Sequence, residues 1–362
     1  CDRRQRQMCI RDSYRGDVEL ELSASDTYSG IKNVTYTVKP DNSREYDVED
    51  GGNNFTSDKK GGIRTSWKNS KVVIGDQSNE VEVFVAVTDN AGNKTLPKKV
   101  GTYAIDKTLP VIDSKYTGIA HNNKYYTSRT ATITITELNF AQERTHVTIQ
   151  KGNETLDITK NFRNIQGNKW VMSCEFGGNS EYGDGDYSNL TVTTRDKAGN
   201  VAKTVVSNDS FTIDNQKPTM TITYDNNNAK SGSYYGEART ATITVNEHNF
   251  APEDITVDAR KDGTPISISG WSGSGDTHVA TVSFNADGNY TISASCKDRA
   301  NNQGNSIETQ SFTVDLTKPE IAIEGVTNGT SYTGSVLPVV RVTDTNYDEG
   351  GVIVTLTGGK NG

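Results

Sequence analysis

The sequence has few of the side chains that most often carry chemistry: its 362 residues include four cysteines, four histidines and three methionines. It also lacks any uninterrupted run of about 18 apolar residues, which excludes a membrane-spanning helix within this stretch. Hydrophobic residues make up 32% of the chain, a share that suits several small two-layer domains better than one large core. The net charge of −8 argues against nucleic acid as a partner, because an acidic protein is repelled by a phosphate backbone.

The histidines do not recur together, and no nucleophile–base pairing, phosphate-binding loop or zinc-ligand spacing is visible in the sequence. We therefore expect that the chain is not an enzyme. Two of the cysteines, Cys174 and Cys296, lie in different repeats at non-equivalent positions. We expect each of them to be a buried thiol that packs as a small hydrophobic side chain.

Residues 1–13 contain the other two cysteines and are basic and rich in arginine and glutamine, unlike the rest of the chain. The stretch Arg6–Ser13 resembles a translated adapter sequence of the kind used to prepare sequencing libraries. We interpret residues 1–13 as an adapter-derived tail and exclude them from the fold; a genuine polar tail is the alternative. On this interpretation the chain is a gene fragment, and a missing signal peptide or cell-wall anchor means nothing.

The main signal in the sequence is an internal repeat of about 105 residues. A turn motif begins at Asp89 as Asp-Asn-Ala-Gly-Asn and returns at Asp196 and, with Asn301 in place of the glycine, at Asp298. After each copy comes an alternating apolar run that closes on an aspartate and, a few residues later, on a proline. The three linkers run over residues 106–110, 214–218 and 315–319.

A third motif follows each linker. It is a run of alternating threonines and apolar residues that ends in Glu137-Leu-Asn139-Phe140 or Glu247-His-Asn249-Phe250, and a looser copy ends in Asp344-Thr-Asn346-Tyr347. Alternation with period two is typical of half-buried strands. It places Val81, Val83, Val85 and Val87 on one face, and Tyr290, Ile292, Ala294 and Cys296 on the matching face of a later repeat.

These patterns predict an all-β chain of tandem immunoglobulin-like β-sandwich domains, because about 100 residues suffice for a sandwich of seven strands. The short linkers with their prolines stiffen the junctions, so we expect an elongated rod. The expected segments are residues 14–106 (domain 1, without its strand A), 107–214 (domain 2), 215–315 (domain 3) and 316–362 (domain 4, truncated).

Two sequences, at Asp184–Tyr187 and Asp287–Tyr290, are typical of the tyrosine corner at the entry to strand F. The first has one extra residue before its turn motif, so we expect a β-bulge there. Repeat one carries Val81 at the tyrosine position. Asn301 replaces a turn glycine, and asparagine tolerates the left-handed backbone conformation that such a turn requires.

On the turn motifs, the linkers and the Asp26–Ile31 segment, the chain resembles the bacterial immunoglobulin-like repeats of large surface proteins of Gram-positive bacteria. The resemblance covers about residues 14–362 and is specific for the module, not for its function. It implies a stalk, an adhesin or a spacer beside catalytic and sugar-binding domains. It also implies an extracellular location at the bacterial cell surface or cell wall.

In a seven-strand sandwich, the BC loop, the FG loop and the entering linker meet at one pole. This topology brings together two sets of oxygen-bearing side chains: Asp106, Glu137, Asn139, Asp196 and Asn200, and then Asp214, Glu247, Asn249, Asp298 and Asn302. Hard oxygen ligands at a junction suit Ca²⁺, which would lock the interdomain angle. The alternative is that these residues only build tight turns.

Sugar binding is a second hypothesis, since tyrosine pairs recur at Tyr125–Tyr126 and Tyr234–Tyr235 and since Trp271, flanked by glycine and serine, is expected to be the most exposed tryptophan. The recurrence of the pairs favours a packing role instead. We therefore predict a non-catalytic structural or adhesive segment, with host or cell-surface proteins or glycans as partners. The alternative is an accessory or carbohydrate-binding segment of a secreted carbohydrate-active enzyme.

Overall fold

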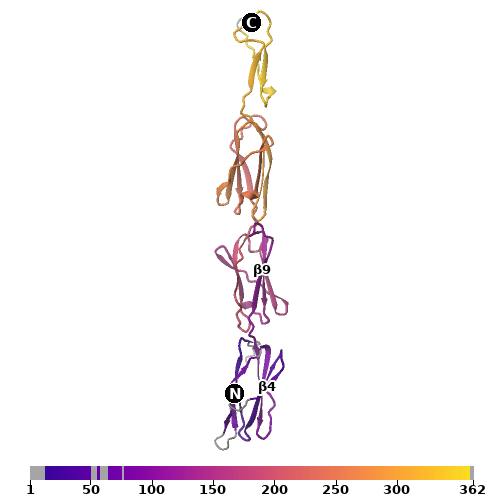
Figure 1. Cartoon of the computed structure of the whole chain (residues 1–362), viewed down its shortest axis with the longest axis vertical. Helices are drawn as coiled ribbons and strands as arrows, with labels where there is room; N and C mark the ends of the chain where they lie inside the picture. Colours follow the sequence, from indigo (N-terminus) through magenta and orange to yellow (C-terminus); the bar gives the residue numbers. More distant parts are fainter. Residues whose placement is uncertain (1–12, 50–54, 58–63, 76, 359–362) are drawn as a thin grey trace. The chain divides into compact units, whose positions relative to one another are not determined.

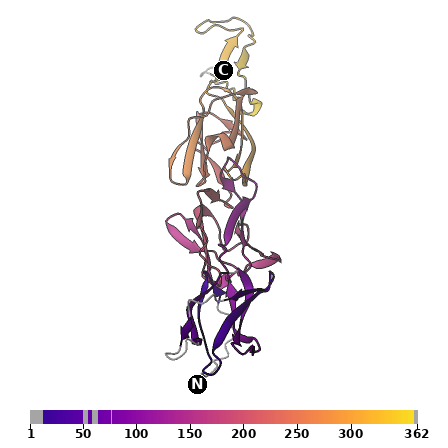
Figure 2. The ribbon, with the colours of Figure 1, turned by 60° about the horizontal axis from the view of Figure 1, so that its bottom comes forward.

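The computed structural model describes the chain except for residues 1–12, 50–54, 58–63, 76 and 359–362. Two compact units are present: one contains the chain up to Ile119 together with Ser128–Asp214, and the other contains Ala120–Thr127 together with Asn215–Gly362. Strands dominate the described residues in both units (Figures 1 and 2). The prediction of an all-β chain is confirmed.

The first sandwich, in the first unit, consists of two facing sheets. One sheet has the strand order β1-β8-β7-β3-β4 and the other β2-β6-β5. The bounds are β1 Ser13–Tyr14, β2 Val18–Ser25, β3 Ile31–Pro40, β4 Tyr46–Glu49, β5 Phe55–Ser57, β6 Arg64–Ile74, β7 Ser78–Asp89 and β8 Lys98–Ile105. Trp67 lies at the centre of the core and is 1% exposed.

The second sandwich follows in the same unit, and its strand order is that of an immunoglobulin-like domain. One sheet runs β14-β15-β11-β9, and the other contains β18-β16-β12-β13 with β17 paired to β16. The bounds are β9 Val111–Thr117, β11 Ser128–Thr136, β12 Thr145–Lys151, β13 Glu154–Asp157, β14 Arg163–Gln166, β15 Lys169–Gly177, β16 Gly185–Thr194, β17 Val205–Ser207 and β18 Phe211–Ile213.

The second unit contains the third sandwich, with sheets β20-β27-β26-β22-β23 and β19-β21-β25-β24, and a separate antiparallel hairpin. The bounds are β19 Thr219–Tyr224, β20 Tyr234–Tyr235, β21 Arg239–Asn246, β22 Ile255–Lys261, β23 Thr264–Pro265, β24 Ser272–Ser274, β25 Thr277–Phe284, β26 Gly288–Lys297, β27 Gln303–Val314 and, in the hairpin, β28 Glu320–Glu324 and β29 Val339–Thr343. The segment Ala120–Thr127 of this unit contains β10 Tyr125–Tyr126, which belongs to neither sheet of the third sandwich. Three short 3₁₀ helices complete the described residues: η1 Gln142–Arg144, η2 Pro252–Asp254 and η3 Glu349–Gly351.

Alternation along the strands builds each core. In β26, Tyr290, Ile292, Ala294 and Cys296 are all buried, as predicted. In β7 the valines all contact the core, although Val85 and Val87 are only partly buried. The pairing of β7 with β8 shifts its register after Val83, and the alternation of burial along β7 changes at that point.

The predicted local features are also present. The hydroxyl groups of Tyr187 and Tyr290 donate to the carbonyl oxygens of Gly183 (2.6 Å) and Ala286 (2.7 Å), as tyrosine corners do. The pairing of β12 with β16 shifts its register opposite Asn189, which has a φ of 53°, so the predicted bulge is confirmed. Asn301 has a φ of 69°, the left-handed conformation expected from its place in the turn.

Candidate metal centre at a junction of two sandwiches

Asp106 is the first residue after β8, at the start of the linker between the first and second sandwiches. Its backbone N–H donates to the carbonyl oxygen of Tyr14 (2.8 Å), which extends the pairing of β1 with β8 by one residue. Its Oδ1 accepts the N–H of Thr108 (3.0 Å). This local turn directs the carboxylate away from solvent, and Asp106 is 6% exposed.

Glu137 follows β11, and both its backbone N–H and its backbone carbonyl form hydrogen bonds. Its backbone N–H donates to the carbonyl oxygen of Asn168 (2.7 Å), and its own carbonyl accepts the indole N–H of Trp170 (3.0 Å). The side-chain Oε1 accepts the N–H of Asn139 (2.7 Å). Glu137 is only 3% exposed, although a glutamate in a loop is normally at the surface.

Asp196 and Asn200 come from the turn after β16. The N–H of Asn200 donates to Asp196 Oδ1 (2.8 Å) and its side-chain Nδ2 donates to Asp196 Oδ2 (2.8 Å). The same Nδ2 lies 2.8 Å from the backbone oxygen of Asp106. Gly199, with a φ of 95°, permits the tight turn that brings these groups together.

The three carboxylates converge, as the topology of the sandwich predicted. One oxygen each from Asp106, Glu137 and Asp196 lies within 4.8 Å of the others, and all three residues are buried. In the part of the chain that the structure describes, none of the three forms an ion pair with a lysine, arginine or histidine. Three buried negative charges without a cation are costly, because burial removes their hydration and they repel one another.

Glu137 shows this cost most directly. Its Oε2 is buried and accepts no hydrogen bond. Burial, and to a smaller degree the charges of Asp106 and Asp196, raises the pKa of Glu137 above its ordinary value of 4.5. The site therefore offers an unsatisfied oxygen to a cation.

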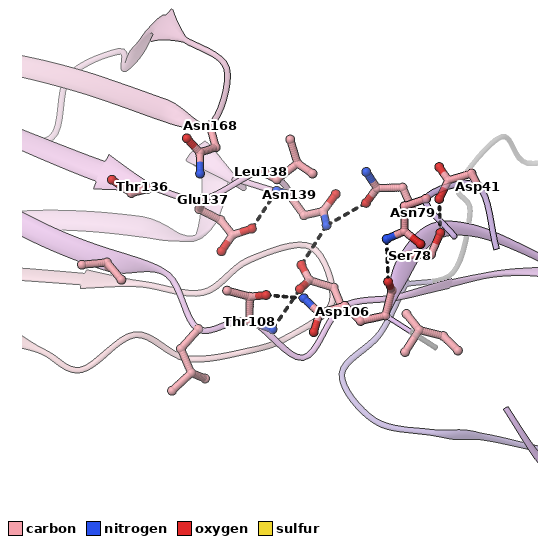
Figure 3. A pocket seen from close by; sticks show the side chains of 15 residues that line it. Asp41, Ser78, Asn79, Asp106, Thr108, Thr136, Glu137, Leu138, Asn139 and Asn168 are labelled. Carbon is pink, nitrogen blue, oxygen red and sulfur yellow. Dashed lines mark hydrogen bonds between the residues drawn. The ribbon is translucent and has the colours of Figure 1, made fainter. Parts of the chain in front are cut away.

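Asn139 and Asn200 lie beside the carboxylates and act as donors toward them. Asn139 Nδ2 donates to Asp106 Oδ2 (2.7 Å) and to Asn79 Oδ1 of the first sandwich (3.3 Å), as Figure 3 shows. These amides hold the carboxylates in place. The carboxylate oxygens of the linker and the loops are therefore already oriented by these hydrogen bonds.

The second predicted set repeats the local geometry within the second unit. Asn249 N–H donates to Glu247 Oε1 (2.7 Å), and Asn302 donates through its N–H (2.8 Å) and its Nδ2 (2.7 Å) to the two oxygens of Asp298. Glu247 and Asp298 are 5% and 1% exposed. Asp214, the linker member of this set, is the last residue of the first unit and is also buried.

The first sandwich contains a variant of this pole that the sequence motifs did not reveal. Asp26 and Asp89 stand at the corresponding loop positions, and the hydroxyl of Ser29 lies within hydrogen-bond distance of both carboxylates, at 3.0 Å and 2.8 Å. In the second sandwich the residue in the place of Ser29 is Phe140, which is 5% exposed. In the sequence, this variant is indicated by serine at position 29 where the second repeat has phenylalanine at position 140.

The three tryptophans considered for sugar binding are buried or partly buried in the structure. Trp271 is partly buried and packs edge-on against Phe250, with ring centroids 5.3 Å apart. Trp67 is in the core of the first sandwich. Tyr125 and Tyr126 are buried, which agrees with a packing role for the tyrosine pair, whereas Tyr234 is 44% exposed.

The histidines lie apart from the carboxylate cluster. The side chain of His248 is 81% exposed and lies 2.8 Å from Asp276, as expected for a loop residue. His278 stacks on Phe250 with a centroid distance of 3.9 Å. No helix in the described residues is long and apolar enough to cross a membrane.

No protein-family model matches this sequence. No curated protein matches it either. Among solved structures, the chain is similar to a tetra-tandem repeat in the extending region of a large adhesion protein, with 16% identity, 92% of this chain and 86% of that chain covered, and a TM-score of 0.34. It is also similar to a D1–D4 ectodomain fragment of ICAM-5 (11% identity, 86% and 75% covered, TM-score 0.37). The assignment of the fold rests on the sheets described above, and the chain is an array of tandem immunoglobulin-like sandwiches.

Proposed function

We propose that this chain is a non-catalytic structural or adhesive segment of an extracellular bacterial surface protein, in which Ca²⁺ holds the junction between the first two sandwiches. The observation that carries the proposal is the buried, unpartnered Oε2 of Glu137 inside a cluster of three carboxylates. Ca²⁺ takes six to eight oxygens at about 2.3–2.6 Å, so two of its ligands can be almost 5 Å apart. The separations within the cluster fit that range.

The cluster joins the linker to both loops of the second sandwich, because Asp106 belongs to the linker and Glu137 and Asp196 to the loops. Other contacts join the linker to the first sandwich. Lys107 Nζ lies 2.8 Å from the carbonyl oxygen of Gly75 and 2.6 Å from Asp17 Oδ1, and the Gln77 side chain bonds the hydroxyl of Thr108. A cation at the cluster would therefore restrict the junction from one side while these contacts restrict it from the other.

The recurrence of the motif extends the proposal to Glu247, Asn249, Asp298 and Asn302 of the second unit, with the same cation. The mechanical consequence would be a stiffer array in the presence of extracellular calcium. Ligand binding to the folded state alone stabilises it by about 2.7 kcal/mol when the free ion is at 100 times its Kd.

Terbium luminescence of the full chain tests the cation. Trp170 is bonded to the backbone of Glu137, so bound Tb³⁺ should emit when tryptophan is excited, and Ca²⁺ should displace it. Glu137→Gln should remove a large part of this emission, whereas Glu154→Gln, an exposed carboxylate on the same sandwich, should not. No sensitised emission from the wild-type chain, or equal emission from both variants, would overturn the metal proposal.

The surface location has a separate test. An antibody raised against the chain should label intact cells of the source bacterium, and protease treatment of those cells should remove the label. Labelling only after the cells are broken open would contradict an extracellular segment.

A further inference from the structure

A pocket of about 380 Å³ lies at the junction of the first and second sandwiches, next to the carboxylate cluster (Figure 3). The first sandwich contributes Asp41, Asn42, Gln77 and Asn79 to its lining. The rest comes mainly from the linker and from the second sandwich, including the loop after β11. Pockets of this size accept a small ligand or one long side chain.

One wall of this pocket is apolar and exposed. Leu109, Val111 and Leu138 are 57%, 62% and 59% exposed, and all three line the pocket. Apolar side chains left in water contribute little to the stability of the fold. An exposed apolar wall inside a pocket is characteristic of a binding surface.

The same fold does not need apolar residues at these positions. A pocket of about 500 Å³ lies at the corresponding place between the third sandwich and the β28–β29 hairpin, and there Lys318, Glu320 and Thr345 occupy the three positions. At the remaining junction the sequence carries Lys217, Thr219 and His248. The apolar wall is therefore particular to the first junction, where packing of the module cannot explain it.

The other side of the pocket is acidic. Asp41 is exposed and accepts a hydrogen bond from the hydroxyl of Ser78, while Asp106 and Glu137 lie deeper. The amides of Asn42 and Asn79 also line the pocket, and among the described residues no lysine, arginine or histidine does. An apolar wall beside an acidic rim complements a side chain that combines an aliphatic stem with a positive end.

We propose that this pocket binds a lysine or arginine side chain presented by an extended segment of a partner protein. The methylene stem would pack against Leu109, Val111 and Leu138, as such stems do on apolar surfaces. The charged end would reach Asp41 and the neighbouring amide oxygens. The chain's net charge of −8 would favour the approach of a basic partner.

Methyl NMR on the full chain, labelled at isoleucine, leucine and valine, tests this proposal. The probes are two capped tripeptides that differ only in the central residue, arginine or glutamate between two leucines. The arginine peptide should cause saturable shifts of the Leu109, Val111 and Leu138 methyl signals, and the glutamate peptide should not. Absence of such shifts, or equal shifts with both peptides, would refute the proposal.

Two variants identify the contacts. Leu138→Thr introduces the residue that stands at position 345, and it should weaken binding of the arginine peptide about tenfold or more, which corresponds to about 1.4 kcal/mol. Asp41→Asn should abolish the preference for arginine. Ile165→Thr, another exposed apolar residue of the second sandwich, is the matched control and should leave binding unchanged.

The pocket shares Asp106 and Glu137 with the carboxylate cluster, but the two proposals can be tested separately because Leu138 and Asp41 do not belong to the cluster. Leu138→Thr and Asp41→Asn should retain the terbium emission, whereas Glu137→Gln should reduce it. Loss of peptide binding with intact emission in these two variants supports the pocket. Unchanged peptide binding in both variants would disprove it whatever the metal result.

Discussion

Asn139 donates its side-chain amide to Asp106 Oδ2 at 2.7 Å, and this bond joins the loop after β11 to the linker after β8. Asn346 makes the same bond to Asp315 Oδ2 at 2.8 Å in the second unit. The bond recurs because the aspartate that ends one module and the asparagine in the next module's loop both belong to the repeated motif. Each module thus carries half of the contact that orients its neighbour.

The effect of Glu137→Gln on the stability of the fold should have opposite signs without and with the metal. Without metal, the variant should be more stable than the wild type at neutral pH, because an amide removes one of three mutually repelling buried charges. With saturating Ca²⁺ it should be less stable, because a ligand is lost. Hydrogen–deuterium exchange of peptides from β11 and β16, in EDTA and in Ca²⁺, measures both effects; the same sign in both conditions would contradict the prediction.

The pH dependence of the metal-free chain follows from the raised pKa of Glu137. A raised pKa in the folded state means that this residue favours folding when protonated. Its contribution is therefore full below the ordinary value of 4.5 and is lost as the pH rises through the folded-state pKa. In EDTA at pH 7, hydrogen–deuterium exchange in β11 should be faster in the wild type than in Glu137→Gln. At pH 4 this difference should be smaller.

Asn200→Ala should destabilise the second sandwich by about 1–3 kcal/mol, since it leaves the buried Asp196 carboxylate and the Asp106 carbonyl without their amide donor. The equivalent Asn93 of the first sandwich is exposed, and its Nδ2 donates to Asp89 Oδ2 (2.7 Å). Asn93→Ala is the matched control and should cost less than about 0.5 kcal/mol. Local hydrogen–deuterium exchange rates in β16 and in β7 measure the loss of stability in the two variants. Equal losses would contradict the role of burial.

Tyr187→Phe and Tyr290→Phe should each lower the stability by about 1 kcal/mol, because each removes one partly buried hydrogen bond to a backbone carbonyl and keeps the ring in the core. Urea unfolding followed by exchange of the second and third sandwiches measures the loss. Tyr28→Phe, at a side chain that is 95% exposed, should have no effect, and a comparable loss there would count against the corner as its cause.

Cys174 and Cys296 should not react with a thiol reagent in the folded chain. Burial raises the pKa of Cys174 to about 11 and also raises that of Cys296, so the thiolate is scarce as well as inaccessible. In a variant with Cys1→Ser and Cys9→Ser, both thiols should be modified in denaturant and neither in buffer. Rapid modification in buffer would show that a core opens readily.

Much of the fold could be predicted because the information is local. Alternation places Tyr290, Ile292 and Cys296 on one face of a strand, and a strand with one apolar face must bury it against another sheet. The tyrosine corner and the bulge at Asn189 depend on a few adjacent residues. The packing of Trp271 could not be predicted in this way, because it depends on Phe250, a residue of another loop that packs against the indole.

The candidate site divides in the same way. The repeated motif places an acid at the linker, an acid after strand B and an acid in the FG turn, so the sequence by itself determined which oxygens could meet. Only the tertiary structure decided that Asp106, Glu137 and Asp196 are buried together and that Glu137 Oε2 is left without a partner. The bridging position of Ser29 and the apolar wall at Leu109 and Leu138 likewise come from the structure. Burial, repulsion and the matching of donors to acceptors depend on the positions of all neighbours at once, and a repeat in sequence does not contain those positions.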